Sequence, residues 1–166
     1  MNEHWPRWID PKGSANLREV APNLYVGGLL GFHKGLQHGI LWTLMLDVAG
    51  LSDSSALHQL KRHRDEDLGF ETWSVRLEDG ESIPSCVLDE LYLLVTTHLK
   101  RGPVIIQCQM GLSRSASVAY AMLRTIFGLD SAEALRRVQT PGLEMYPLKP
   151  TLESAMRWAL EMRIRR

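Results

Sequence analysis

The sequence predicts an α/β domain with a mainly parallel central sheet flanked by helices on both faces. Short apolar runs typical of buried strands, such as residues 41–48 and 103–107, alternate along the chain with segments whose apolar residues recur at helical spacing. Strands that alternate with helices form a sheet of this kind. Ligands bind beyond the carboxyl ends of the strands in such sheets, so residues that follow a strand are the first candidates for a functional site.

The individual elements follow from local patterns and from the turn residues between them. Strands are expected at residues 17–20, 23–27, 41–48, 70–77 and 103–107. Helices are expected at residues 32–38, 54–61, 84–101, 115–127, 131–139 and 151–163. The pattern is clearest at 84–101, where the apolar residues share one face and Gly102-Pro103 ends the helix.

Length and composition are those of one globular domain. The 166 residues are 45% hydrophobic and 23% charged with no net charge, so no basic field indicates nucleic acid or membrane as a partner. Two cysteines argue against a disulfide framework and for a reducing compartment, so we expect a cytoplasmic protein. The longest apolar run, Leu41 to Leu46, is too short to span a bilayer.

We divide the chain into an N-terminal arm, residues 1–16, and a single domain, residues 17–166, and we expect a monomer. The arm is polar and has no apolar core of signal-peptide length. Its Trp5 and Trp8 are expected to pin it to the domain, and ligand recognition is the alternative role.

The segment from Val104 to Ala116 carries the strongest functional pattern, Val-Ile-Ile-Gln-Cys-Gln-Met-Gly-Leu-Ser-Arg-Ser-Ala. A buried strand is followed by a tight turn and then by an apolar helix that Gly128 ends. The first turn of a helix has unpaired N–H groups and about half a positive charge, and the amides of the turn can point at one place as in a nest. The segment therefore predicts an anion site.

Two side chains give this anion site its chemistry. Arg114 carries a planar fork of donors that matches two phosphate oxygens. Cys108 lies at the lip, where the field that holds a phosphate would also hold a thiolate. A free cysteine has a pKa of about 8.5, and surroundings of this kind can lower such a value to roughly 3.5–7.5. A nucleophile and an anionic substrate are therefore expected at one point.

Cys108-x5-Arg114 followed by Ser115 resembles the phosphate-binding loop of the protein tyrosine phosphatase superfamily, and it is most similar to the small dual-specificity phosphatases. The Leu-Tyr-Val-Gly segment at residues 24–27 also resembles the opening hairpin of these phosphatases. Cys-x5-Arg alone is a weak pattern. The preceding strand, the glycine at the fourth position and the long apolar helix make it specific. The alternative is a structural cysteine in an ordinary strand-to-helix connection.

The resemblance implies a cysteine-dependent phosphoric monoester hydrolase that forms a phosphocysteine intermediate. The resemblance also implies a role for each of three residues. Cys108 is the nucleophile, Arg114 stabilises the transferred phosphoryl group, and Ser115 helps the thiolate to leave. The phosphate-binding residues that it implies are Gln109, Met110, Gly111, Leu112, Ser113 and Arg114.

The resemblance also implies a general acid in a loop after a strand and before a long helix. Asp79 has this position, because it follows the expected strand at 70–77 and therefore lies at the same edge of the sheet as Cys108. Asp47, at the end of another strand, is the competing candidate, and Glu78 and Glu81 are weaker ones.

One residue departs from the family pattern, because most members have a histidine just before the nucleophile and this chain has Gln107. That histidine helps to orient the loop and tune the thiolate. Gln107 can still form hydrogen bonds, so activity is expected. Cys86 is expected to be an inert helix thiol, and a redox-protective disulfide with Cys108 is the alternative.

No cofactor and no metal are expected. The histidines of two pairs, His33 with His38 and His58 with His63, are five positions apart, a spacing that does not place them on one helix face.

The expected partners are phosphorylated proteins or peptides, together with a phosphate-like anion in the loop. No long insert builds a deep pocket, so phosphoserine and phosphothreonine are expected beside phosphotyrosine. The loop contains no lysine, which argues against a highly charged inositol phosphate. Two alternatives stay open: a phosphatase acting on an RNA 5′ end, a lipid or a sugar phosphate, and a low-activity module that binds phosphorylated partners.

Overall fold

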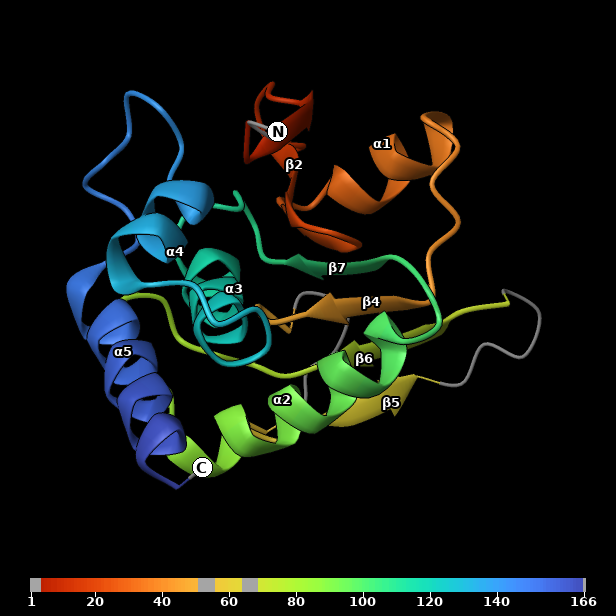
Figure 1. Cartoon of the computed structure of the whole chain (residues 1–166). Coiled ribbons are helices and arrows are strands. Elements are labelled where there is room, and N and C mark those ends of the chain that lie inside the picture. The colour runs from red at the N-terminus through yellow and green to blue at the C-terminus, as the bar shows by residue number, and fades with distance from the viewer. Residues whose placement is uncertain (1–3, 51–55, 64–68, 166) are drawn as a thin grey trace.

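The computed structural model describes residues 4–50, 56–63 and 69–165, which form one seven-stranded sheet with helices on both faces (Figure 1). The strands are β1 (Arg7–Asp10), β2 (Leu17–Ala21), β3 (Leu24–Gly27), β4 (Leu44–Asp47), β5 (Lys61–His63), β6 (Glu71–Ser74) and β7 (Val104–Gln107). The helices are α1 (Gly31–Gln37), α2 (Ser85–Leu99), α3 (Arg114–Thr125), α4 (Ser131–Val138) and α5 (Lys149–Ile164).

The strand order is β1-β2-β3-β7-β4-β6-β5. The four central strands, β3, β7, β4 and β6, are parallel, and the strands outside them pair antiparallel. The expected α/β fold with a mainly parallel centre is therefore confirmed. None of the described helices is long and apolar enough to cross a membrane.

Alternation along β7 explains why both faces of the sheet are covered. Val104 and Ile106 belong to the larger core on the side of α2, α3, α4 and α5, whereas Ile105 packs with Tyr25 and Trp42 on the side of α1. Successive side chains of a strand point to opposite faces, so an unbroken apolar run is what a strand covered on both faces requires. Full burial of each such side chain is worth about 1.5–3 kcal/mol.

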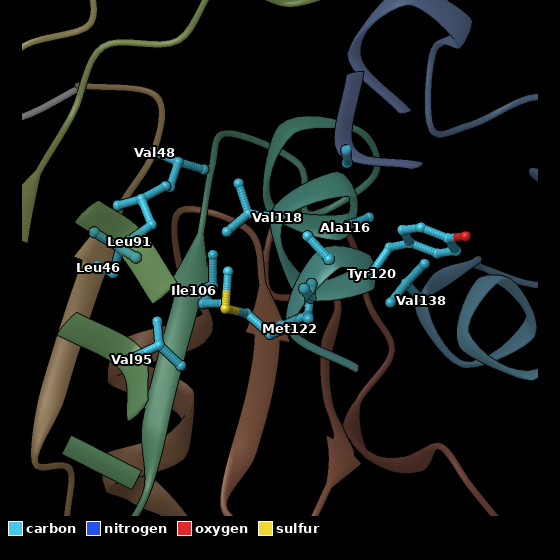
Figure 2. Packing of buried hydrophobic residues seen from close by; sticks show 14 of the residues in the cluster. Leu46, Val48, Leu91, Val95, Ile106, Ala116, Val118, Tyr120, Met122 and Val138 are labelled. Atoms are coloured by element: carbon cyan, nitrogen blue, oxygen red, sulfur yellow. The ribbon is translucent and has the colours of Figure 1, made fainter. Parts of the chain in front are cut away.

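The larger core packs β7 and α3 together, and these two elements flank the loop at residues 108–113. Figure 2 shows Ile106 of β7, Leu91 of α2, and Val118 and Met122 of α3 as parts of one packed cluster. All four are fully buried. The strand before the loop and the helix after it are therefore held rigidly on either side of it.

Helix α3 is buried along its length, as its apolar sequence predicts. Every residue from Ser115 to Thr125 is buried, and the helix packs against α4 and α5. Gly128 has a left-handed φ of 66°, which turns the chain so that the Leu129 N–H donates to the Leu123 carbonyl at 3.2 Å. Gly128 thus follows the end of the helix as expected.

Part of the expected N-terminal arm joins the sheet, because β1 pairs antiparallel with β2. Trp5 is buried, and the guanidinium groups of Arg7 and Arg137 lie 4.4 and 5.3 Å from its ring centroid. The arm is therefore attached both to the edge of the sheet and to α4.

The expected helix at residues 54–61 is wrong over the part that the structure describes. His58 has a left-handed φ of 64°, which a helix cannot accommodate, and Leu57 forms an isolated bridge with Arg76. From Lys61 the chain is strand β5, which pairs with β6. Residues 54 and 55 of that expected helix lie outside the described residues. Pairing along the sheet edge has overridden a weak helical pattern.

Candidate active site

Cys108 follows the last residue of β7 and opens the loop that leads into α3. A pocket of about 100 Å³ lies over this loop. It is lined by Asp79, Cys108, Gln109, Met110, Leu112, Ser113, Arg114 and Tyr146. The structure therefore brings Asp79 to the same small cavity as Cys108 and Arg114, although 29 positions separate Asp79 from Cys108 in the sequence.

The Cys108 sulfur is sheltered beneath the pocket and contacts the first turn of α3. Its side chain is only 3% exposed, and its Sγ lies 3.1 Å from the Ser115 Oγ. A hydroxyl at this distance can donate a hydrogen bond to a thiolate, and the start of a helix adds a favourable positive field. Ser115 is fully buried and does not line the pocket. It touches the sulfur from below.

The loop carbonyls are held from outside the pocket. The Leu29 N–H donates to the Gln109 carbonyl at 2.9 Å, and Asn16 Nδ2 donates to the carbonyls of Met110 and Gly111 at 3.1 and 3.3 Å. In a planar trans peptide the N–H points away from the preceding C=O. The N–H groups of Met110 and Gly111 are therefore turned away from Leu29 and Asn16, neither of which lines the pocket. This is the arrangement that an anion-binding nest requires.

Arg114 is anchored by one nitrogen and has another available. Its Nη1 donates to the Leu77 carbonyl at 3.1 Å, just before Asp79. Its Nε is buried and has no hydrogen-bond partner among the described residues. Leaving a buried donor unpaired costs about 1–3 kcal/mol. Arg114 lines the pocket and carries this unpaired donor as well as a positive charge, which together favour an anionic ligand there.

The backbone of the loop packs directly against the end of β3 and the residue that follows it. Gly111 has a left-handed φ of 71°, and a Cβ there would lie 2.7 Å from the Gly27 carbonyl carbon. A Cβ on Gly28 would lie 2.1 Å from the Ser14 carbonyl oxygen and 2.9 Å from that of Gln109. Both approaches involve backbone atoms, so neither could be relieved by a side-chain rotation.

We therefore expect Gly28→Ala to destabilise the protein by about 1–3 kcal/mol and to weaken phosphate binding, because the Gln109 carbonyl must move. Thermal unfolding and calorimetric titration with inorganic phosphate would measure the two effects. Gly13→Ala is the control for phosphate affinity, since a Cβ on Gly13 would meet no atom within 4 Å and Gly13 does not line the pocket. Unchanged phosphate affinity in Gly28→Ala would contradict this account of the loop.

Among the described residues, Asp79 is the one of the four candidate carboxylates that lines the pocket. Asp47 is buried at the end of β4, and its Oδ1 accepts a hydrogen bond from the Ala49 N–H at 3.0 Å. Glu78 forms an ion pair with Arg76 at 2.9 Å. The position of Asp79 favours it over these alternatives for proton transfer at the Cys108 pocket.

Cys86 and the histidines contribute no group to the pocket lining. Cys86 is an exposed free thiol on α2, and Cys108 is likewise free. In the described ranges 4–50, 56–63 and 69–165, no three His, Cys, Asp or Glu side chains are grouped to hold a metal ion.

Three residues at or behind the pocket were missed by sequence reasoning. Tyr146 lines the pocket from the segment before α5, while Asn16 and Arg18 contact the loop from behind. Arg18 offered one signal, because it stands in an expected strand between Leu17 and Val20. A charged residue in a buried strand needs a specific partner. Asn16 and Tyr146 offered none, since their contacts depend on the tertiary fold.

A second hollow of about 440 Å³ lies beside α2 and β6. It is lined by Leu60, Trp73, Glu90, Leu93, Leu94, Thr97 and His98. It is larger than the Cys108 pocket, but it contains neither a cysteine nor an arginine. It therefore lacks the nucleophile and the anion-binding arginine that line the Cys108 pocket.

The fold is that of the cysteine-based protein tyrosine and dual-specificity phosphatases. The chain is similar to human DUSP28, with TM-score 0.69, 17% identity, and coverage of 93% of this chain and 100% of that one. It is also similar to P. aeruginosa TpbA, with TM-score 0.64, 16% identity and coverage of 96% of both chains. PTPMT1 in complex with PI(5)P gives TM-score 0.64, 14% identity, and coverage of 98% and 99%. No protein-family model matches the chain, and no curated protein matches its sequence.

Proposed function

We propose that this chain is a cysteine-dependent phosphoric monoester hydrolase, and that its substrates are proteins phosphorylated on tyrosine and on serine or threonine. One feature of the pocket supports this reaction most strongly. Cys108 lines one pocket together with Asp79 and with Arg114, whose Nε is buried and has no partner among the described residues. A nucleophile, an anion-binding fork and a proton donor are the three groups that hydrolysis of a phosphate monoester requires.

In the first step the Cys108 thiolate attacks phosphorus in line with the ester oxygen. The S–P bond forms as the P–O bond breaks, and the electron pair of the P–O bond goes to the leaving oxygen. Asp79 gives that oxygen its proton. Arg114 and the loop N–H groups stabilise the charge on the three remaining phosphoryl oxygens. The product is phosphocysteine and a free hydroxyl group.

In the second step water hydrolyses the phosphocysteine. Asp79, now a carboxylate, takes a proton from the water as its oxygen bonds to phosphorus, and the S–P bond breaks. Sulfur leaves as a thiolate, which the hydroxyl of Ser115 at 3.1 Å stabilises. Inorganic phosphate then departs, and both groups have returned to their starting states.

The charges of the pocket favour a single phosphate group as the ligand. Arg114 is the one lysine or arginine among the described lining residues, so the pocket does not match a ligand with several phosphates. Among the structural relatives, TpbA has also been solved in complex with pTyr, and PTPMT1 with PI(5)P. A protein monoester is therefore our first choice, and a phosphoinositide is the alternative that most needs testing.

A panel of phosphopeptides, mononucleotides, RNA 5′ phosphates, phosphoinositides and sugar phosphates tests this choice. We expect phosphotyrosine and phosphoserine or phosphothreonine peptides to give the highest kcat/KM. Hydrolysis confined to a phosphoinositide, a sugar phosphate or RNA would keep the reaction and overturn the protein substrate. Phosphopeptide binding without turnover of any compound would overturn the enzymatic proposal itself.

Arg114→Lys should lower kcat by more than it raises KM. Lysine keeps the positive charge but loses the planar fork, which fits the transferred phosphoryl group best in the transition state. We expect a fall of about 10²–10³-fold in kcat, as for the loss of one preorganised donor at a developing charge. Steady-state kinetics on a phosphotyrosine peptide would measure it. A change in KM alone would mean that Arg114 only binds the ground state.

A further inference from the structure

Arg18 of β2 is a buried cation that the proposed reaction does not use. Its side chain is 0% exposed, and no carboxylate lies within ion-pair distance of it among the described residues. It donates instead to three carbonyl oxygens, those of Asn16 at 2.8 Å, Gly111 at 3.0 Å and Val138. A buried charge without a carboxylate is costly, so its surroundings must compensate for it.

One of those carbonyls belongs to the phosphate loop. The Gly111 oxygen accepts from both Arg18 and Asn16, so its orientation is fixed by two donors. Because the peptide is planar and trans, the N–H of Leu112 points to the opposite side. Leu112 lines the pocket, whereas Arg18 and Asn16 do not. The two donors thus set the direction of a loop N–H without touching the ligand.

Arg18 also brings a positive charge to the back of the loop. Burial lowers the pKa of Arg18 to about 10, while the negative charge of the Cys108 thiolate acts to raise it. Arg18 therefore remains protonated near neutral pH. The other charged or titratable groups near the sulfur are Asp79, Arg114 and Tyr146, which line the pocket, and Asp47, at the end of the neighbouring strand β4.

We propose that Arg18 is a positioning residue that holds the Gly111–Leu112 peptide in its anion-binding orientation and places a buried positive charge behind the loop that begins at Cys108. This inference rests on the proposed function, because it concerns the same loop and the same nucleophile. It adds a second cation to the site. Arg114 lines the pocket itself, and Arg18 supports the loop from outside it.

The test measures Cys108 without relying on turnover. In a Cys86→Ser background, which removes the exposed thiol, alkylation by iodoacetamide would be followed against pH for the parent, Arg18→Met and Arg18→Lys. Calorimetry would give the affinity for inorganic phosphate, and melting would check the fold. Arg124→Met is the matched control. Arg124 is 6% exposed and donates to the Leu129 carbonyl at 2.6 Å, but it lies about 15 Å along α3 from Arg114.

Arg18→Met should shift the alkylation profile to higher pH, so that reaction at about pH 6 is about tenfold slower, and it should weaken phosphate binding about tenfold. Arg18→Lys should keep the parent's alkylation profile, because the charge remains, yet bind phosphate more weakly, because it has fewer donors for the carbonyls. Arg124→Met should change neither property.

An unchanged alkylation profile and phosphate affinity in folded Arg18→Met would overturn the inference. If Arg18→Met does not fold, Arg18→Lys decides: parent-like phosphate affinity would overturn the positioning role, and weaker affinity with a parent-like profile supports it. A different result would contradict the proposed function. A parent protein that hydrolyses no phosphate ester would contradict the reaction, while alkylation would still report the effect of Arg18 on the sulfur.

Discussion

Cys108→Ser is expected to abolish turnover of every phosphate ester while preserving the fold and the affinity for phosphate. A serine hydroxyl is a much weaker nucleophile than a thiolate unless a base removes its proton. The rate should therefore fall by at least about 10⁴-fold. The anion site should survive because it is built from loop N–H groups and Arg114. Steady-state kinetics and calorimetric titration with phosphate or vanadate would measure the two properties.

The matched control is Cys86→Ser, which removes the other thiol of the chain from an exposed position on α2. It should keep parental kinetics. Appreciable turnover by Cys108→Ser on any substrate would rule out the covalent mechanism, and loss of activity in Cys86→Ser would mean that the wrong cysteine has been assigned.

Asp79→Asn is expected to have an effect that depends on the leaving group. An aryl phosphate with an electron-withdrawing ring leaves as a stable phenolate and hardly needs a proton, whereas phosphoserine would leave as a strongly basic alkoxide. Proton transfer from a placed acid is worth about 10²–10⁴-fold. The substitution should therefore cost little on an activated aryl phosphate and about that factor on phosphotyrosine or phosphoserine peptides. It should also remove the alkaline limb of the pH–rate profile.

Asp47→Asn separates this role from a general effect of losing a carboxylate at the same sheet edge. Asp47 is buried and bonded to the Ala49 N–H, and it does not line the pocket. Its variant should keep both the leaving-group dependence and the alkaline limb of the parent. Both variants would be compared on aryl phosphates of graded leaving-group pKa. A steeper dependence for Asp47→Asn, with no change for Asp79→Asn, would make Asp47 the acid.

The parts of the fold and of the site that could be predicted are those that short stretches of sequence determine. The apolar run of β7, the turn after it and the buried helix α3 lie within 22 consecutive positions, 104–125, so strand and helix patterns place Cys108 directly after the strand, in the loop that leads into the helix. The position of Asp79 could be predicted from the sheet topology, because the carboxyl ends of neighbouring parallel strands meet at one edge of the sheet. The structure brings Asp79 into the pocket; its chemical role remains a prediction.

What could not be predicted depends on contacts between distant segments. Arg18, a charged residue in an expected strand, indicates that a partner is needed but not which one, and its hydrogen-bond partners Gly111 and Val138 lie more than 90 positions away. Tyr146 reaches the pocket because the Leu148 N–H donates to the Ser113 Oγ at 3.0 Å and fastens its segment to the loop. The failed helix at 54–61 has the same cause, since sheet-edge pairing with β6 decided its conformation.

In the proposed reaction, phosphate is transferred to Cys108 before it reaches water. Rapid acid quench during turnover of an activated aryl phosphate, followed by peptide mass spectrometry, tests this transfer directly, and Ser115→Ala should increase the trapped amount because it slows departure of the thiolate. We expect one phosphoryl group on the peptide that contains Cys108, absent from Cys108→Ser. Turnover with no phosphorylated Cys108 peptide in either the parent or Ser115→Ala, or a phosphoryl group on another residue, would contradict the mechanism.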